Sequence, residues 1–155
     1  MTDTVADAVG TREITITRVF DAPRELVWKA WTEPDQLARW WGKRGWSTPV
    51  STITMDVQPG GAFRLTSVRD EDGTEMHSAG EYREVVEPER LVLVETADSG
   101  CPENAGAEAV VTFTDLGSGR TQMVFRTTIH TIHTNLDGAA AGMASAFDRL
   151  AEYLT

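Results

Sequence analysis

The fold is decided by residues 20–42, FDAPRELVWKAWTEPDQLARWWG, which separate one strand pattern from all the others. Pro23 suits the first turn of a helix, where its missing N–H costs no hydrogen bond. Four apolar residues at helical spacing then predict a helix over residues 23–31: Leu26, Val27, Ala30 and Trp31. A second short helix, capped by Thr32 and ended by Gly42, is predicted to carry Leu37, Trp40 and Trp41.

Alternating apolar and polar residues on both sides of this stretch predict half-buried strands. One strand precedes it at residues 14–20, and about six follow between Ser51 and Ile129. The strands are separated by turn residues such as Pro59-Gly60-Gly61 and Asp72-Gly73, of which Asp-Gly is a strong hairpin signal. Consecutive strands joined by tight turns indicate an antiparallel meander.

From residue 137 the apolar period changes from two to three or four, which is typical of a helix. The apolar face of this helix, over residues 137–154, consists of Ala139, Met143, Ala146, Phe147, Leu150 and Leu154. The sequence therefore predicts an α+β fold with two short helices after the first strand and a curved antiparallel sheet of about six to seven strands wrapped around the C-terminal helix. Residues 12–155 are expected to form this single domain, after a flexible leader at residues 1–11.

The composition argues against several classes of partner. The chain has 155 residues, a formal net charge of −10 and no cluster of Lys and Arg, whereas binding to nucleic acids or anionic membranes requires a basic face. No apolar run approaches the roughly 18 residues of a membrane span. Cys101 is the single cysteine, so no intrachain disulfide can form. We therefore expect a cytoplasmic protein with no nucleic-acid or membrane partner.

Motifs spread over residues 12–154 occur in an order that matches a known superfamily. They are Phe20-Asp21-Ala22-Pro23, Val27-Trp28-Lys29-Ala30-Trp31-Thr32-Glu33-Pro34, Trp40-Trp41-Gly42, Pro59-Gly60-Gly61-Ala62-Phe63, Gly80-Glu81-Tyr82, Glu87-Pro88-Glu89-Arg90-Leu91 and Phe147-Asp148-Arg149-Leu150. The combination resembles the START-like superfamily, also called SRPBCC or Bet v 1-like, and most closely its heat-shock-protein-90 ATPase activator-like branch. The resemblance implies a helix-grip fold with a cavity between the sheet and the final helix. It does not imply one activity, since relatives include lipid and hormone carriers, polyketide aromatase/cyclases, antibiotic-sequestering proteins and co-chaperone domains.

Two positions depart from the family pattern. Lys43 follows Trp-Trp-Gly where the family often has Pro. In the last helix, Gly142-Met143 stands where the family often carries Gly-Trp. A Met in place of Trp is expected to enlarge or soften the cavity at that point, because its side chain is smaller and more flexible.

Ten side chains are predicted to line the cavity: Trp41, Trp46, Met55, Phe63, Leu65, Tyr82, Phe113, Phe125, Met143 and Phe147. Within each strand, the apolar residues alternate with polar ones and therefore lie on the same face of the sheet, which is its apolar face. Met143 lies four residues before Phe147 on the apolar face of the last helix. The two tryptophans flank a glycine-containing loop over residues 42–45 that can form the mouth. The hydroxyl of Tyr82 can orient a ligand. For each residue the alternative is an ordinary place in a solid core.

Polar residues in the strands are assigned by parity. Glu84 shares the parity of Tyr82 and on that ground faces the interior, where a carboxylate needs a partner. A structural ion pair at the sheet edge is the favoured alternative for Glu84. Arg64 and Arg126 have the opposite parity to the apolar face and are expected to point to solvent.

No metal site or cofactor is expected. His130 closes a strand and His133 opens a loop, so the two rings are not expected to converge on one ion. Cys101 has no adjacent base to activate its thiol. No glycine-rich phosphate loop follows a strand and opens a helix.

Three functions remain in view from the sequence. The first is non-enzymatic binding of a small apolar molecule, aromatic or lipid-like, in the cavity. The second is an enzyme of the cyclase or aromatase kind, for which Tyr82, Glu84 and His77 are the interior acid–base candidates. The third is a co-chaperone-like interaction with a chaperone partner, and the sequence is also compatible with a homodimer. We expect the first, with no residue assigned as catalytic.

Overall fold

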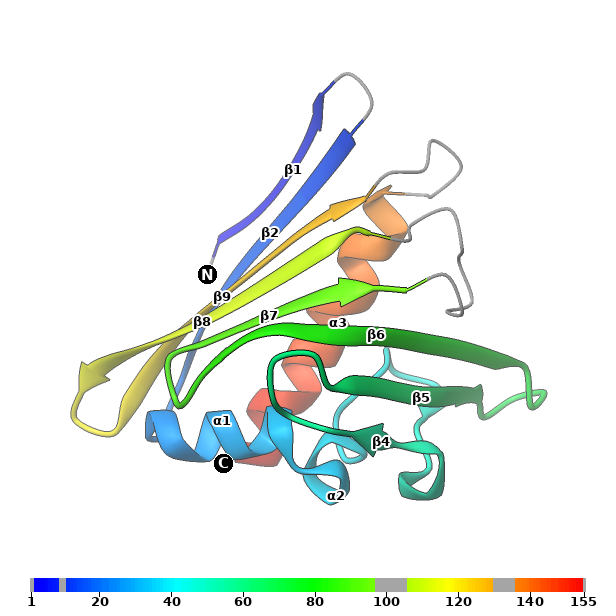
Figure 1. Ribbon diagram of the computed structural model, residues 1–155, viewed down its shortest axis with the longest axis horizontal. Helices are drawn as coiled ribbons and strands as arrows, with labels where there is room; N and C mark the ends of the chain where they lie inside the picture. Colours follow the sequence, from blue (N-terminus) through cyan, green and yellow to red (C-terminus); the bar gives the residue numbers. More distant parts are fainter. Residues whose placement is uncertain (1, 9–10, 97–105, 130–135, 155) are drawn as a thin grey trace.

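A curved antiparallel sheet with one long helix behind it makes up most of the structure (Figure 1). The computed structural model describes residues 2–8, 11–96, 106–129 and 136–154. The strands are β1 (Thr2–Ala8), β2 (Thr11–Phe20), β3 (Trp46–Ser47), β4 (Thr54–Met55), β5 (Ala62–Arg69), β6 (Glu75–Val86), β7 (Arg90–Glu95), β8 (Glu108–Gly117) and β9 (Arg120–Ile129). The helices are α1 (Arg24–Thr32), α2 (Pro34–Leu37) and α3 (Leu136–Leu154), with a 3-10 turn at Val50–Thr52.

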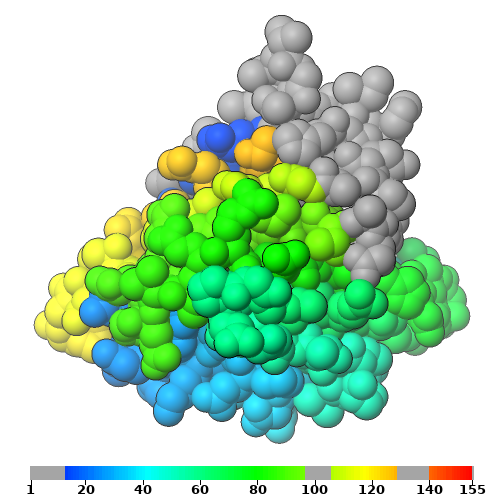
Figure 2. Space-filling view, viewed as in Figure 1, coloured from blue at the N-terminus to red at the C-terminus, as the bar shows by residue number. Residues whose placement is uncertain are grey.

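Within the described residues, nine strands form one sheet in the order β1-β2-β9-β8-β7-β6-β5-β3, and β4 pairs with β5. All pairings are antiparallel, and β2 closes against β9 so that the first and last long strands are neighbours. In Figure 2 strand atoms occupy the centre of this face, atoms of α1 and α2 lie along its lower edge, and no atom of α3 is visible. Figure 1, drawn from the same side, shows α3 behind the strands. The predicted α+β, helix-grip fold is confirmed. The six strands expected between Ser51 and Ile129 are β4 to β9, of which β4 has only two residues, and the extra strands are β1 and the two-residue β3.

The first strand is the largest departure from the sequence analysis. A flexible leader was expected at residues 1–11, but β1 pairs along its whole length with β2, from Thr2↔Thr17 to Ala8↔Thr11. Addition of an edge strand requires only backbone hydrogen bonds. A segment that contributes little apolar surface therefore leaves no burial pattern in the sequence by which it can be recognised.

The second short helix is shorter than expected. Thr32 is the last residue of α1, and its hydroxyl donates to the carbonyl oxygen of Trp28 at 2.8 Å instead of capping the next helix. Glu33 occupies the N-cap of α2, which ends at Leu37. Trp40 and Trp41 therefore lie in the turns that follow, and Gly42, with a φ of 93°, ends the segment as predicted.

Large side chains fill one half of the concave side of the sheet. The ring of Phe147 is fully buried and lies 5.4 Å from Phe125 and 6.0 Å from Trp31, measured between ring centroids. Leu150 on the same face of α3 is also fully buried. The preceding half of α3, residues 136–146, consists mainly of Ala and Gly, and Met143 is only half-buried there. Packing is thus dense at the C-terminal half of α3 and looser before it.

This asymmetry predicts unequal costs for two truncations on one helix face. Phe147→Ala should lower the free energy of unfolding by about 3–5 kcal/mol, because it removes a fully packed ring. Met143→Ala should cost less than about 2 kcal/mol, because a side chain that borders a void has fewer contacts to lose. Urea denaturation of both variants measures the difference, and equal losses would contradict the packing described above.

Candidate ligand-binding cavity

An apolar cavity of about 120 Å³ lies between the sheet and α3. We call it the inner chamber. It is lined by Trp31, Leu37, Trp41, Met55, Phe63, Leu65, Tyr82, Leu91, Leu93, Ala109, Phe125 and Met143. These side chains come from the segment after β2, from β4 to β9 and from the middle of α3, so distant parts of the chain converge on one space.

Most of the predicted lining residues meet at this chamber. Seven of the ten line it: Trp41, Met55, Phe63, Leu65, Tyr82, Phe125 and Met143. Strand parity correctly placed the strand residues among them on the concave face. Trp31, one of the apolar residues that predict the first helix, is buried and also forms part of the chamber wall.

The other three predicted residues lie elsewhere in the described structure. Phe113 packs 5.8 Å from Trp28, and Phe147 belongs to the same filled half of the concave side. Trp46 is buried at the sheet edge, where the Arg69 guanidinium lies 5.2 Å from its ring and the Lys43 ammonium 5.8 Å. Alternation identifies the face of the sheet on which a side chain lies, but not its position on that face. It therefore could not distinguish residues that line the chamber from residues of the solid core.

A β-bulge explains why Glu84 does not follow Tyr82 into the interior. The pairing of β6 with β7 shifts between these residues, from Tyr82↔Leu93 to Glu84↔Val92, which leaves Arg83 as the extra residue. The face of every later residue in β6 is therefore reversed. Glu84 instead pairs with Arg90 at 3.1 Å. The structural ion pair favoured from the sequence is therefore present, but it joins two strands inside the sheet and not at its edge.

Tyr82 contributes a neutral phenol to the chamber. Its side chain is buried and its ring lies 5.9 Å from that of Phe63. Burial raises the pKa of the Tyr82 phenol far above its usual value, and the nearby Asp56 carboxylate raises this pKa further. The hydroxyl is therefore held protonated, as an orienting group for a ligand requires.

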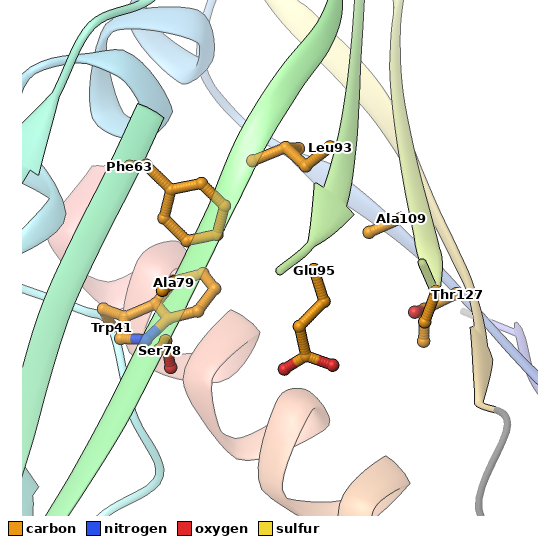
Figure 3. Close-up of a pocket in the computed structure, with 9 residues that line it drawn as sticks. Trp41, Phe63, Ser78, Ala79, Leu93, Glu95, Ala109 and Thr127 are labelled. Carbon is orange, nitrogen blue, oxygen red and sulfur yellow. The ribbon is translucent and has the colours of Figure 1, made fainter. Parts of the chain in front are cut away.

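A second cavity of about 160 Å³, which we call the outer chamber, continues from the first at the ends of β7, β8 and β9. The two share four lining residues: Trp41, Phe63, Leu93 and Ala109. The outer chamber also has polar walls formed by Ser78, Glu95 and Thr127. Figure 3 shows the Glu95 side chain extending into the middle of this space, between Trp41 and Thr127.

Glu95 was not predicted from the sequence as a lining residue, although its position in β7 carries a signal. Leu91 and Leu93 point to the concave face, and Glu95 is the next residue of that parity in β7.

The register places Glu95 opposite Gly80. A Cβ at Gly80 would collide with the Phe63 ring and with the carbonyl oxygen of Val94. Glycine at this position thus lets the Phe63 ring lie flat on β6, where it forms part of the wall of both chambers.

Arg149 of α3 holds the segment that carries Trp41. Its guanidinium donates to the carbonyl oxygens of Gly42 at 2.8 Å, Trp46 at 3.2 Å and Trp41 at 3.3 Å. Arg44 in the same loop adds a backbone hydrogen bond to the Ser145 hydroxyl at 3.1 Å. These contacts fix the loop against α3, so that Trp41 forms a wall of both chambers.

The remaining polar candidates lie away from the chambers or outside the described residues. His77 is exposed, with Thr66 at 2.9 Å and Glu75 at 3.6 Å. Arg64 and Arg126 are exposed, as predicted. Cys101, His130 and His133 lie outside the described residues.

The chain belongs to the family of Activator of Hsp90 ATPase homolog 1-like proteins, whose model matches residues 21–155. Solved structures share its fold. A protein from Nitrosomonas europaea is 26% identical with a TM-score of 0.75, over 92% of this chain and 93% of that one. One from Chromobacterium violaceum is 23% identical with a TM-score of 0.81, over 95% and 98%. An AHSA1-like protein from Aeromonas hydrophila is 25% identical with a TM-score of 0.72, over 90% of each chain.

No curated protein shows significant similarity to the sequence. Among the described residues, no helix is both long enough and apolar enough to cross a bilayer.

The Arg149 contacts predict that a single substitution at this position lowers the stability of the protein. Arg149→Gln should lower the free energy of unfolding by about 1.5–3 kcal/mol, because several half-buried carbonyl oxygens lose a charged donor. Arg44→Gln is the matched control, since its ion pair with Glu152 is exposed and should contribute little. Chemical denaturation compares the two, and similar losses in both variants would show that Arg149 does not hold the loop.

The raised pKa of Tyr82 predicts a loss of stability in alkali. Above about pH 10 the phenol ionises in the unfolded chain but stays protonated in the folded one. Unfolding then releases a proton, so the free energy of unfolding falls as pH rises. Tyr82→Phe should show a shallower fall between about pH 10 and about pH 11. Urea titrations over this range measure it, and identical slopes would rule out Tyr82 as the source.

Proposed function

We propose that the protein binds a small apolar molecule, aromatic or lipid-like, in the inner chamber without transforming it. The observation that carries this proposal is the lining: eleven of the twelve residues have wholly apolar or indole side chains, and the twelfth, Tyr82, keeps its proton. Apolar contact area supplies the affinity in such a site. An apolar cavity of about 150 Å³ stays dry and takes up benzene, so about 120 Å³ suits one aromatic ring or the end of an alkyl chain.

Binding is favoured over catalysis because the expected acid–base groups do not converge. Of the three interior candidates, only Tyr82 reaches the chamber. Glu84 is paired with Arg90, and His77 is exposed. A cyclase-like mechanism requires a group that exchanges a proton near neutral pH. A phenol with a strongly raised pKa does not meet that requirement.

The family description names activators of the Hsp90 ATPase, and a chaperone partner would dock on the surface of the chain. Over the described residues, the exposed large apolar side chains are spread over six elements, with two at opposite ends of β6: Val19, Leu26, Val50, Met76, Val86, Leu116 and Tyr153. Scattered exposed residues are normal on a soluble surface and do not mark a docking patch. A cytoplasmic location, suggested by the single cysteine, is part of this proposal.

Toluene tests the proposal directly. At ten times its dissociation constant it should raise the free energy of unfolding by about 1.4 kcal/mol, visible as a higher melting temperature. Met143→Trp should fold but show no toluene response, because the indole fills the chamber. Ala141→Trp is the matched control, since Ala141 is exposed on the same helix and a Trp there leaves the chamber open.

Two results would contradict the proposal. One is the absence of any thermal shift in the unmodified protein with toluene and with longer alkyl compounds. The other is unfolding of Met143→Trp while Ala141→Trp remains folded, which would show that there is no room beside α3.

A further inference from the structure

Two hydrogen-bond donors in the wall of the inner chamber have no acceptor in the described structure. Trp31 is only 5% exposed, and its indole N–H has no hydrogen-bond partner among the described residues. Tyr82 is 2% exposed, and its hydroxyl makes no hydrogen bond to a described residue either. Both side chains line the inner chamber. Two donors are thus buried around one apolar space.

An unpaired buried donor costs free energy, because it has lost its hydrogen bond to water without gaining another. The neighbouring Trp40 has the usual arrangement, since its indole N–H donates to the carbonyl oxygen of Ala30 at 2.9 Å. Trp31 is surrounded by aromatic rings, whose faces are weak acceptors. These rings are Trp40, Trp41, Phe113, Phe125 and Phe147. The inner chamber borders the same indole, so an oxygen atom held there can approach the N–H.

The polar groups of the chamber wall donate hydrogen bonds much more readily than they accept them. An indole nitrogen donates and cannot accept. Burial raises the pKa of the Tyr82 phenol, so this group keeps its proton. The other described lining residues have hydrocarbon or thioether side chains, apart from the indole of Trp41. A water molecule can accept from these donors, but it finds hardly any acceptor for its own hydrogens. The chamber therefore complements a molecule that brings an acceptor.

We propose that the ligand carries a hydrogen-bond-accepting oxygen on its apolar body, such as the carbonyl oxygen of an aromatic ketone or ester, and that this oxygen accepts hydrogen bonds from the Tyr82 hydroxyl and the Trp31 indole. This inference rests on the proposed function and adds the polar group of the ligand. A carbonyl oxygen has two lone pairs and can accept from both donors. The apolar body supplies the affinity, and the two donors orient it. A hydrocarbon of the same shape leaves both donors unpaired.

Acetophenone and α-methylstyrene test the inference, because they have the same shape and differ only in an oxygen atom against a CH₂ group. The ketone is better hydrated, so in a chamber without donors it should bind much more weakly than the alkene. With the donors of Tyr82 and Trp31 available, acetophenone should bind the unmodified protein at least as tightly as α-methylstyrene. Isothermal titration calorimetry measures both dissociation constants.

The hydroxyl of Tyr82 can be removed with a matched control. Tyr82→Phe should weaken acetophenone binding about tenfold, equivalent to about 1.4 kcal/mol, and leave α-methylstyrene binding unchanged. Tyr153→Phe is the control, because Tyr153 is the other tyrosine of the chain and lies exposed near the end of α3. Tyr153→Phe should change neither dissociation constant.

NMR spectra of the indole N–H groups test the role of Trp31. The two ligands carry the same ring, so their ring-current effects on a nearby proton are similar, but only the ketone accepts a hydrogen bond. The Trp31 indole proton should therefore lie further downfield with acetophenone than with α-methylstyrene. The Trp40 indole proton, already bonded to Ala30, should have the same position with both ligands. A Trp31 proton at the same position with both ligands would overturn its assignment as a donor.

The outcomes separate this inference from the proposed function. If α-methylstyrene binds and acetophenone binds much more weakly, the acceptor on the ligand is overturned and the apolar site stands. If Tyr82→Phe weakens acetophenone binding no more than Tyr153→Phe does, Tyr82 is not the donor, which also overturns the inference. If neither probe binds, the proposed function itself fails. The ranking of the two probes in the unmodified protein decides the matter even if Tyr82→Phe does not fold.

Discussion

The packing of the Trp31 indole between the sheet and the last helix is the contact on which the rest of the structure depends. Its ring centroid lies 4.9 Å from that of Trp40, 6.0 Å from Phe147 and 6.5 Å from Phe125. These rings belong to the segment after α2, to α3 and to β9. One side chain therefore contacts the connecting segment, the last helix and the sheet. The Trp40 contact is edge-to-face, the Phe147 contact is tilted and the Phe125 contact is stacked, and ring pairs of this kind add to the free energy of apolar burial. The inner chamber begins where this aromatic cluster ends, since Trp31 and Phe125 form part of its wall.

Two further features keep the chamber open. Before Phe147, α3 packs the small side chains of Ala140 and Ala146 and the half-buried Met143 against the core, whereas Phe147 and Leu150 fill the space beneath its second half. Arg149 then fixes the loop that carries Trp41, so that the loop covers the space as a wall and does not collapse into it. A void next to apolar side chains costs dispersion contacts. A protein that keeps such a void at the junction of several elements gives up stability that a larger residue at Met143 could supply, and a ligand can recover that stability on binding.

Much of this arrangement could be predicted from the sequence, because the spacing of apolar residues along the chain indicates which side chains are buried. Alternation identified the long strands and their concave face, and a period of three to four identified α3. Alternation failed at Glu84, where a one-residue bulge reverses the faces of β6, and bulges leave no mark in a binary pattern. It also could not separate Phe113, in the filled half, from Phe125, in the chamber wall, because depth depends on which helix residues are small. β1 was missed because it has few apolar residues, and Glu95 because the apolar alternation of β7 ends before this charged residue.

Xenon is the most direct probe of the central claim, which is that an apolar space persists between the sheet and α3. A crystal of the protein under xenon pressure should show density in the inner chamber, bounded by Trp31, Phe63 and Met143, because xenon enters dry apolar cavities without requiring polar partners. Density at this position would establish the space independently of any ligand. A xenon-pressurised crystal with side-chain atoms filling the chamber and no xenon between them would contradict the account.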